Sequence, residues 1–177
     1  MRSTQCACSS SCCANGWDRP SPWRRYLDVL VALNMVIVVQ PWHRNIARSL
    51  LQAPKVYFTD TGLVKGDAGV RFENAVAVML RKQVHHLVET RGCDAGLHYI
   101  RTKDDAEVDF SLSLEGSLSH LVECKLADSS PHRALSRFAL QFPEAEAVQL
   151  VRDARQQEQR GAVTVMPAGE WLARLPV

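Results

Sequence analysis

Hydrophobic and polar residues alternate most strictly in two consecutive segments, 107–114 and 118–127. In the first, every even-numbered residue is apolar and every odd-numbered residue is polar. In the second, Leu118, Val122, Cys124 and Leu126 share one face with His120, and Glu123 and Lys125 point the other way. Alternation with a period of two is typical of strands that bury one face. The pattern therefore predicts a hairpin, closed by the turn at 115–117.

The same alternation predicts the register of this hairpin. If 115–117 is a three-residue loop with Gly116 at a positive φ, a common hairpin geometry, Leu114 lies opposite Leu118. A shift of one residue would set apolar against polar positions along the whole ladder. The expected pairs are then Phe110 with Val122, Asp109 with Glu123, Val108 with Cys124, and Glu107 with Lys125.

Helical periodicity flanks the hairpin on both sides. One helix is predicted from about residue 72 to 87, and another begins at Pro131, which suits a first helical turn. The apolar face of the first holds Phe72, Ala75, Val76, Met79, Leu80 and Leu87, and that of the second holds Leu135, Phe138, Ala139 and Phe142. Short strands are predicted at 98–100, 147–151 and 162–166. Helix, three strands, helix and two strands predict an α/β fold with a mixed central sheet flanked by helices.

The chain before residue 66 has a different pattern. Residues 23–65 show an apolar helical stretch, a β-branched run at 36–39 and a second short strand at 55–58, closed by a turn at 60–62. A helix followed by two short strands predicts a partial winged-helix-like segment. Residues 1–22 show no periodicity and are expected to be a disordered, unrelated leader. The expected division is thus 1–22, 23–65 and 66–177.

The composition of the chain bears on its partners and its location but does not identify a function. The 177 residues are 46% hydrophobic and 23% charged, with a net charge of +2, which is too small to indicate a nucleic-acid partner by itself. The most apolar stretch, 26–39, is shorter than the ~20 residues that a membrane span needs. Four of the six cysteines crowd the start of the chain, and no signal peptide precedes them. We expect a cytoplasmic protein without a membrane segment.

The predicted hairpin carries candidate chemistry on its polar face. The register makes Asp109 and Glu123 cross-strand neighbours, with Cβ atoms roughly 5 Å apart. Two carboxylates so placed usually share a proton or a cation, and oxygen ligands alone suit Mg²⁺ or Mn²⁺. Lys125 lies on the same face, where it can orient or deprotonate water or balance phosphate charge. The alternative is a solvated polar face with Lys125 paired to Glu107. No P-loop motif occurs, so no ATP site is expected in this chain.

The order of these residues resembles a known signature. Glu on a helix, Asp on a strand and Glu-x-Lys on the next strand are the signature of PD-(D/E)xK nucleases, with Glu73, Asp109, Glu123 and Lys125 at the matching positions. The segments 55–63, 72–74, 101–102, 107–110 and 123–125 further resemble the uncharacterised C-terminal domain of prokaryotic AAA-type ATPases. The resemblance implies a restriction-endonuclease-like core, and a metal held by Glu73, Asp109 and Glu123.

Two functions follow from this resemblance. The first is an Mg²⁺-dependent phosphodiesterase that acts on nucleic acid, with Lys125 positioning or activating water. The second is a non-catalytic module that binds DNA or a partner protein and once regulated an attached ATPase. Because this chain has no ATPase module, ATP hydrolysis is not carried over. An ATPase module acting in trans is one partner that the resemblance implies.

Overall fold

The computed structural model describes residues 22–42, 53–102 and 104–175. The leader expected at 1–22 lies outside these residues except for Pro22, which begins the first helix. The helices are α1 (Pro22–Ala32), α3 (Ala68–Arg91), α4 (Arg133–Gln141) and α5 (Ala168–Ala173), with one short 3₁₀ turn, η1 (Thr61–Leu63). The strands are β1 (Val36–Pro41), β2 (Lys55–Phe58), β3 (Ala95–Arg101), β4 (Glu107–Leu114), β5 (Ser117–Lys125), β6 (Glu146–Val151), β7 (Glu158–Arg160) and β8 (Val163–Pro167).

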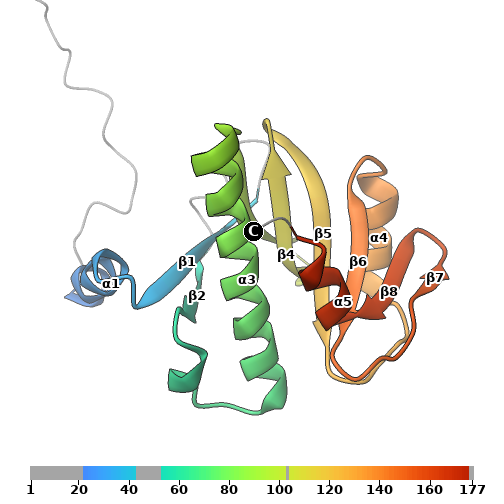
Figure 1. Cartoon of the computed structure of the whole chain (residues 1–177), viewed down its shortest axis with the longest axis horizontal. Helices are drawn as coiled ribbons and strands as arrows, with labels where there is room; N and C mark the ends of the chain where they lie inside the picture. Colours follow the sequence, from blue (N-terminus) through green and yellow to red (C-terminus); the bar gives the residue numbers. More distant parts are fainter. Residues whose placement is uncertain (1–21, 43–52, 103, 176–177) are drawn as a thin grey trace, which may run out of the picture.

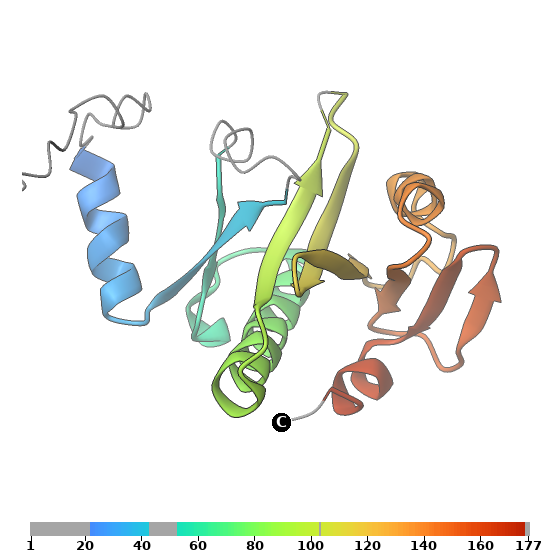
Figure 2. The same ribbon diagram turned by 90° about the horizontal axis from the view of Figure 1, so that it is seen from above.

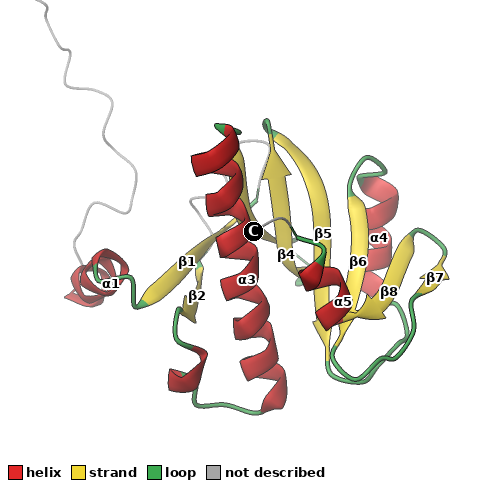
Figure 3. Ribbon diagram, viewed as in Figure 1, coloured by secondary structure: helices red, strands yellow, loops and turns green. Residues whose placement is uncertain are grey.

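The described strands form one mixed sheet in the order β2-β1-β3-β4-β5-β6-β8-β7. Strand β1 runs parallel to β3, and β6 runs parallel to both β5 and β8, whereas the other neighbours are antiparallel. Helices α3 and α5 lie on one side of this sheet and α4 on the other (Figures 1 and 2). The predicted mixed sheet flanked by helices is confirmed, and Figure 3 shows the two layers of helix around it.

Each side of the sheet has its own apolar core. Under α3, the buried residues include Val76, Ala77 and Leu80 of the helix with Phe110 and Val122 of the hairpin. Under α4, the core is formed by residues from the helix and the strands it covers, namely Leu135, Phe138, Ala139, Phe142, Leu121, Val151 and Val163. The central hairpin is therefore covered on both sides. Of its polar residues, Ser111 and Glu123 are buried and Asp109 and Lys125 are partly buried, where the sequence alone allowed a solvated face.

The buried face of α3 differs from the expected one. Met79 is 37% exposed and Ala75 is only partly buried, whereas Asn74 and Gln83 are buried. Asn74 is buried because its amide matches the edge of β2: its Oδ1 accepts from the Phe58 N–H at 2.8 Å, and its Nδ2 donates to the Phe58 carbonyl at 2.8 Å. Hydrophobic periodicity cannot identify a polar residue that is satisfied in this way.

The hairpin has the predicted frame but a different turn. Phe110 pairs with Val122, and Leu112 pairs with His120. The turn has two residues, Glu115 and Gly116, at φ 50° and 75°, so Leu114 pairs with Ser117 and not with Leu118. Two consecutive positive φ angles match the twist of antiparallel strands. An irregularity between Leu112 and Ser113 then restores the predicted frame toward the site.

The segment expected to resemble a winged helix contributes to the same sheet. Strand β1 pairs with β2 on one side and with β3 on the other. Ile37, Val39 and Tyr57 lie in the core under α3. Helix α1 leaves Trp23 and Tyr26 exposed. None of the described helices is both long and apolar enough to cross a bilayer.

Candidate functional site

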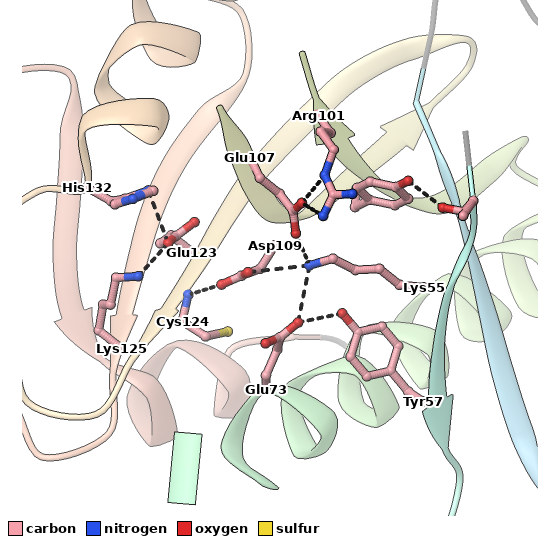
Figure 4. A network of polar contacts seen from close by, with 12 residues as sticks. Lys55, Tyr57, Glu73, Arg101, Glu107, Asp109, Glu123, Cys124, Lys125 and His132 are labelled. Atoms are coloured by element: carbon pink, nitrogen blue, oxygen red, sulfur yellow. Dashed lines mark hydrogen bonds and ion pairs between the residues drawn. The ribbon is translucent and has the colours of Figure 1, made fainter. Parts of the chain in front are cut away.

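The polar network at the centre of the sheet collects side chains from five elements (Figure 4). Strand β2 provides Lys55 and Tyr57, α3 provides Glu73, β4 provides Glu107 and Asp109, β5 provides Glu123 and Lys125, and His132 stands just before α4. All four residues singled out from the sequence, Glu73, Asp109, Glu123 and Lys125, are in this network. They form two groups, one around Lys55 and one around Glu123.

Lys55 is the centre of the first group. Its Nζ lies 2.6 Å from Glu107 Oε1, 3.3 Å from Glu73 Oε1 and 3.5 Å from Asp109 Oδ1. Tyr57, two residues along the same strand, donates from its hydroxyl to Glu73 Oε1 at 2.6 Å. The carboxylate of Glu73 is therefore held by two residues of β2, and the Asn74 contact to Phe58 fixes the helix against that strand.

Glu123 is the centre of the second group. Its Oε1 lies 2.7 Å from Lys125 Nζ and 3.1 Å from His132 Nδ1. The Glu123 side chain is 3% exposed, and its other oxygen, Oε2, is buried without a hydrogen-bond partner among the described residues. The alternative pairing of Lys125 with Glu107 is wrong, because Glu107 is bound by Lys55 and Arg101.

Asp109 lies between the two groups. Its Oδ1 faces Lys55, and its Oδ2 accepts a hydrogen bond from the Cys124 N–H at 2.9 Å. The backbone ladder of the hairpin extends only to Phe110 and Val122, so the expected pairs 109–123, 108–124 and 107–125 are not part of it. Here the N–H of Cys124 donates to the Asp109 side chain and not to a backbone carbonyl of β4. This hydrogen bond fixes the orientation of the Asp109 carboxylate.

Burial and like charge raise the proton affinity of these carboxylates. Burial, with the nearby charges of Glu123 and Glu73, raises the pKa of Asp109 to about 7. Burial also raises the pKa of Glu123, although Lys125 opposes this shift. Burial alone would lower the pKa of Lys55, but Glu107, Glu73 and Asp109 raise it to about 12. The site thus has two carboxylates that hold a proton more tightly than usual, as the sequence led us to expect.

This electrostatic arrangement predicts a pH dependence of stability. The pKa of Asp109 is about 7 in the folded chain, above its ordinary value of 3.8, so protonation favours folding. Its contribution to stability is complete below pH about 4 and is lost as the pH rises through about 7. When the pH is raised from 5 to 8, the free energy of unfolding, measured with urea, should therefore fall less for Asp109→Asn than for wild type. An equal fall in both proteins would show that the pKa of Asp109 is not raised in the folded chain.

The carboxylate oxygens of the site are of the type that binds a divalent metal, but only two of the carboxylates are suitable ligands. Asp109 and Glu123 offer oxygen ligands, the type that Mg²⁺ and Mn²⁺ prefer, and Glu123 Oε2 lacks a partner. In the part of the chain that the structure describes, no three acidic, histidine or cysteine side chains converge as a ready metal site. Glu73, expected as a third ligand, is bound by Lys55 and Tyr57. A metal would thus be held by Asp109 and Glu123, with water and substrate oxygens beside them.

Sequence reasoning assigned no role to several residues that build this site. Lys55 and Tyr57 belong to a short strand that looked like part of a separate segment.

The backbone at His132 is positioned by Gln149, a fully buried residue of β6. Gln149 Oε1 accepts from the His132 N–H at 2.7 Å. Its Nε2 donates to the carbonyls of Asp128 and Ser130 at 3.0 and 2.9 Å, which ties down the loop before α4. In the sequence, Gln149 is the polar residue inside the otherwise apolar run 147–151, and this pattern could have indicated a buried polar residue with a structural role.

A cavity of about 460 Å³ adjoins the network. Glu107, which contacts Lys55, and His132, which contacts Glu123, belong both to the network and to the cavity wall. Its lining is formed by the loop before β4 and the start of α4, namely Asp104, Asp105, Ala106, Glu107, His132, Arg133, Ala134 and Arg137. The cavity therefore meets the network at Glu107 and His132, and its wall carries both acidic and basic side chains.

Comparison with known proteins gives relatives without an assigned activity. Uncharacterized proteins of Mycobacterium bovis and Mycobacterium tuberculosis are each 31% identical to the chain over 103 residues. The match covers 52% of this chain and 22% of each relative, so it spans less than a quarter of their length. No solved structure matches the chain.

Two family models match consecutive parts of the chain. Residues 14–72 match a domain of unknown function (DUF8612), which includes α1, β1 and β2. Residues 68–171 match another domain of unknown function (DUF4143), which includes α3, the hairpin and α4. The two matches overlap at residues 68–72, in the first turns of α3. Since the second match covers more than half of the 177 residues, the chain belongs to the DUF4143 family.

Proposed function

We propose that the chain is a nuclease-like domain, an Mg²⁺- or Mn²⁺-dependent phosphodiesterase that acts on nucleic acid. The observation that carries this proposal is the buried Oε2 of Glu123, which has no hydrogen-bond partner among the described residues, while Oε1 of the same carboxylate contacts Lys125. A buried carboxylate oxygen without a partner costs free energy, and a bound cation would supply the missing interaction.

The residues of the site have distinct roles in this proposal. Asp109 and Glu123 would hold the metal, which lowers the pKa of a bound water and neutralises phosphate charge. Partial burial alone would lower the pKa of Lys125, but contact with Glu123 raises it above its usual value. Lys125 therefore stays a cation at neutral pH, where it stabilises the negative charge that develops on the phosphate. It positions water and phosphate and does not serve as a base. Tyr57 and Lys55 fix Glu73 at the edge of the site.

The cavity beside the site supports a phosphate-containing substrate. Arg133 and Arg137 lie one helical turn apart on α4, both are exposed, and both line the cavity that reaches His132. Arginine side chains are common ligands of nucleic-acid phosphates, where they fix the register of the backbone without reading its sequence. The proposed substrate is therefore a polynucleotide whose backbone crosses α4 and enters at Glu107 and His132.

The proposed partner is an ATPase module. This chain resembles the C-terminal domain of AAA-type ATPases, and its matched region covers only 22% of each mycobacterial relative. In such an arrangement, the motor would be covalently attached in longer proteins or would act in trans on this chain. The ATPase module would move or remodel DNA, and this domain would cleave the phosphodiester bond.

A cleavage assay tests the proposal. Purified protein is incubated with labelled single- and double-stranded DNA and RNA, with Mg²⁺, Mn²⁺ or EDTA. We expect slow cleavage with either metal and none with EDTA, together with a melting temperature that rises with metal concentration. Binding of DNA that is unchanged by EDTA, with no cleavage in either metal, would favour the second function, a non-catalytic binding module. The three carboxylates around Lys55 favour that second function, since they are already partly neutralised.

A further inference from the structure

Lys55 lies where three carboxylates from two elements, α3 and β4, meet. Its ammonium nitrogen contacts one oxygen each from Glu107, Glu73 and Asp109, at 2.6, 3.3 and 3.5 Å, and its side chain is 19% exposed. Three carboxylate oxygens around one ammonium nitrogen carry the kind of negative charge that a second divalent cation neutralises in two-metal phosphodiesterase sites. An ammonium group and a metal ion cannot occupy this position together.

The backbone around Lys55 fixes the side chain in this position. Lys55 pairs with Val39 in the sheet, so its strand is held by β1. Its Nζ lies 5.5 Å from the centre of the Tyr99 ring, a further favourable contact for a cation. The neighbouring hydrogen bond from Tyr57 to Glu73 holds one of its three acidic partners. Lys55 is thus a constrained part of the site, unlike an exposed lysine that moves freely in solvent.

The charges of the network leave room for one further cation. Within the described residues of Figure 4, four carboxylates, those of Glu73, Glu107, Asp109 and Glu123, face three cationic side chains, those of Lys55, Arg101 and Lys125. Among the four carboxylates, Glu123 Oε2 is the buried oxygen that has no hydrogen-bond partner within the described residues. One divalent ion there would change the net charge of these groups from about −1 to about +1, which suits a substrate phosphate.

We propose that Lys55 takes the place of a second divalent ion, so that this site holds a single metal, between Asp109 and Glu123. This inference rests on the proposed metal-dependent function and specifies its stoichiometry. Lys55 is a positioning residue here: it holds Glu73 and Asp109 in place through charge, and it excludes a second ion from the space between Glu73, Glu107 and Asp109.

Titration of the metal-free protein with Mn²⁺ by calorimetry tests this inference. Wild type should bind about one Mn²⁺ per chain. Lys55→Met and Lys55→Gln both remove the charge and should each gain a second bound Mn²⁺, whereas Lys82→Met, at an exposed position of α3, should behave as wild type. Circular dichroism confirms that each variant is folded, and the Gln variant provides the result if the Met variant is not.

The outcomes separate this inference from the proposed function. Two Mn²⁺ ions bound to wild type, no second ion in either folded Lys55 variant, or no Mn²⁺ bound to any of the proteins would overturn the role of Lys55. One Mn²⁺ in wild type and two in the Lys55 variants support it, whether or not nucleic acid is cleaved. Wild type that binds one Mn²⁺ and cleaves no substrate would contradict only the proposed function.

Discussion

Lys125→Ala is expected to lower the rate of metal-dependent cleavage by at least about 100-fold, the usual effect of removing one preorganised group that stabilises a transition state. Its Nζ is 2.7 Å from Glu123 Oε1, and its raised pKa keeps it positively charged. Glu123→Gln should cause a similar loss, because it removes the charge that the metal requires. The measurement is the initial rate on a labelled DNA or RNA substrate at saturating Mn²⁺.

The matched control is Lys82→Ala, which removes an exposed lysine of α3 outside the network and should leave the rate unchanged. The double variant of Lys125 and Glu123 should be little slower than either single variant, because groups that act as one unit lose activity non-additively. A Lys125→Ala protein that keeps more than about half of the wild-type rate would exclude Lys125 from the reaction.

Phe110→Ala is expected to destabilise the fold by about 3–5 kcal/mol, the range for removing a buried aromatic ring. Phe110 is fully buried in the core under α3, and its ring centre lies 5.3 Å from that of Tyr57. It is also the last residue of the hairpin ladder before the site, so the cavity left behind would loosen the support of Tyr57 and Asp109.

Urea unfolding measures this effect, with Leu140→Ala as the comparison. Leu140 is an apolar residue of α4 that is 77% exposed, so its removal should change stability by no more than about 0.5 kcal/mol. If both substitutions cost about the same, Phe110 is not the core residue that the fold requires.

The sequence predicted the parts of the fold that repeat with a simple period. The strict alternation in 107–114 was sufficient to predict that Phe110 pairs with Val122. A register shifted by one residue would place apolar residues opposite polar ones. The apolar spacing of α4 likewise gave Leu135, Phe138 and Ala139 as core residues. These signals are local, and they arise from residues that are neighbours along one strand or one helix.

The sequence was less informative where a polar group is satisfied by a distant partner. Lys55 is 18 residues before Glu73 and 54 residues before Asp109, and no local pattern shows that β2 joins the sheet beside β1. The turn was one residue shorter than expected because Glu115 itself adopts a positive φ, which favours glycine but does not require it. Asn74 and Gln149 were missed for the same reason, since both are buried polar residues whose partners lie on other elements.

Anomalous X-ray scattering from crystals grown with Mn²⁺ would locate the proposed metal in the site. We expect one manganese ion in contact with Glu123 Oε2 and with Asp109, with Lys55 still in contact with Glu107 and Glu73. An Mn²⁺ ion that avoids both Asp109 and Glu123, or full-occupancy binding only at a surface site elsewhere, would contradict this expectation.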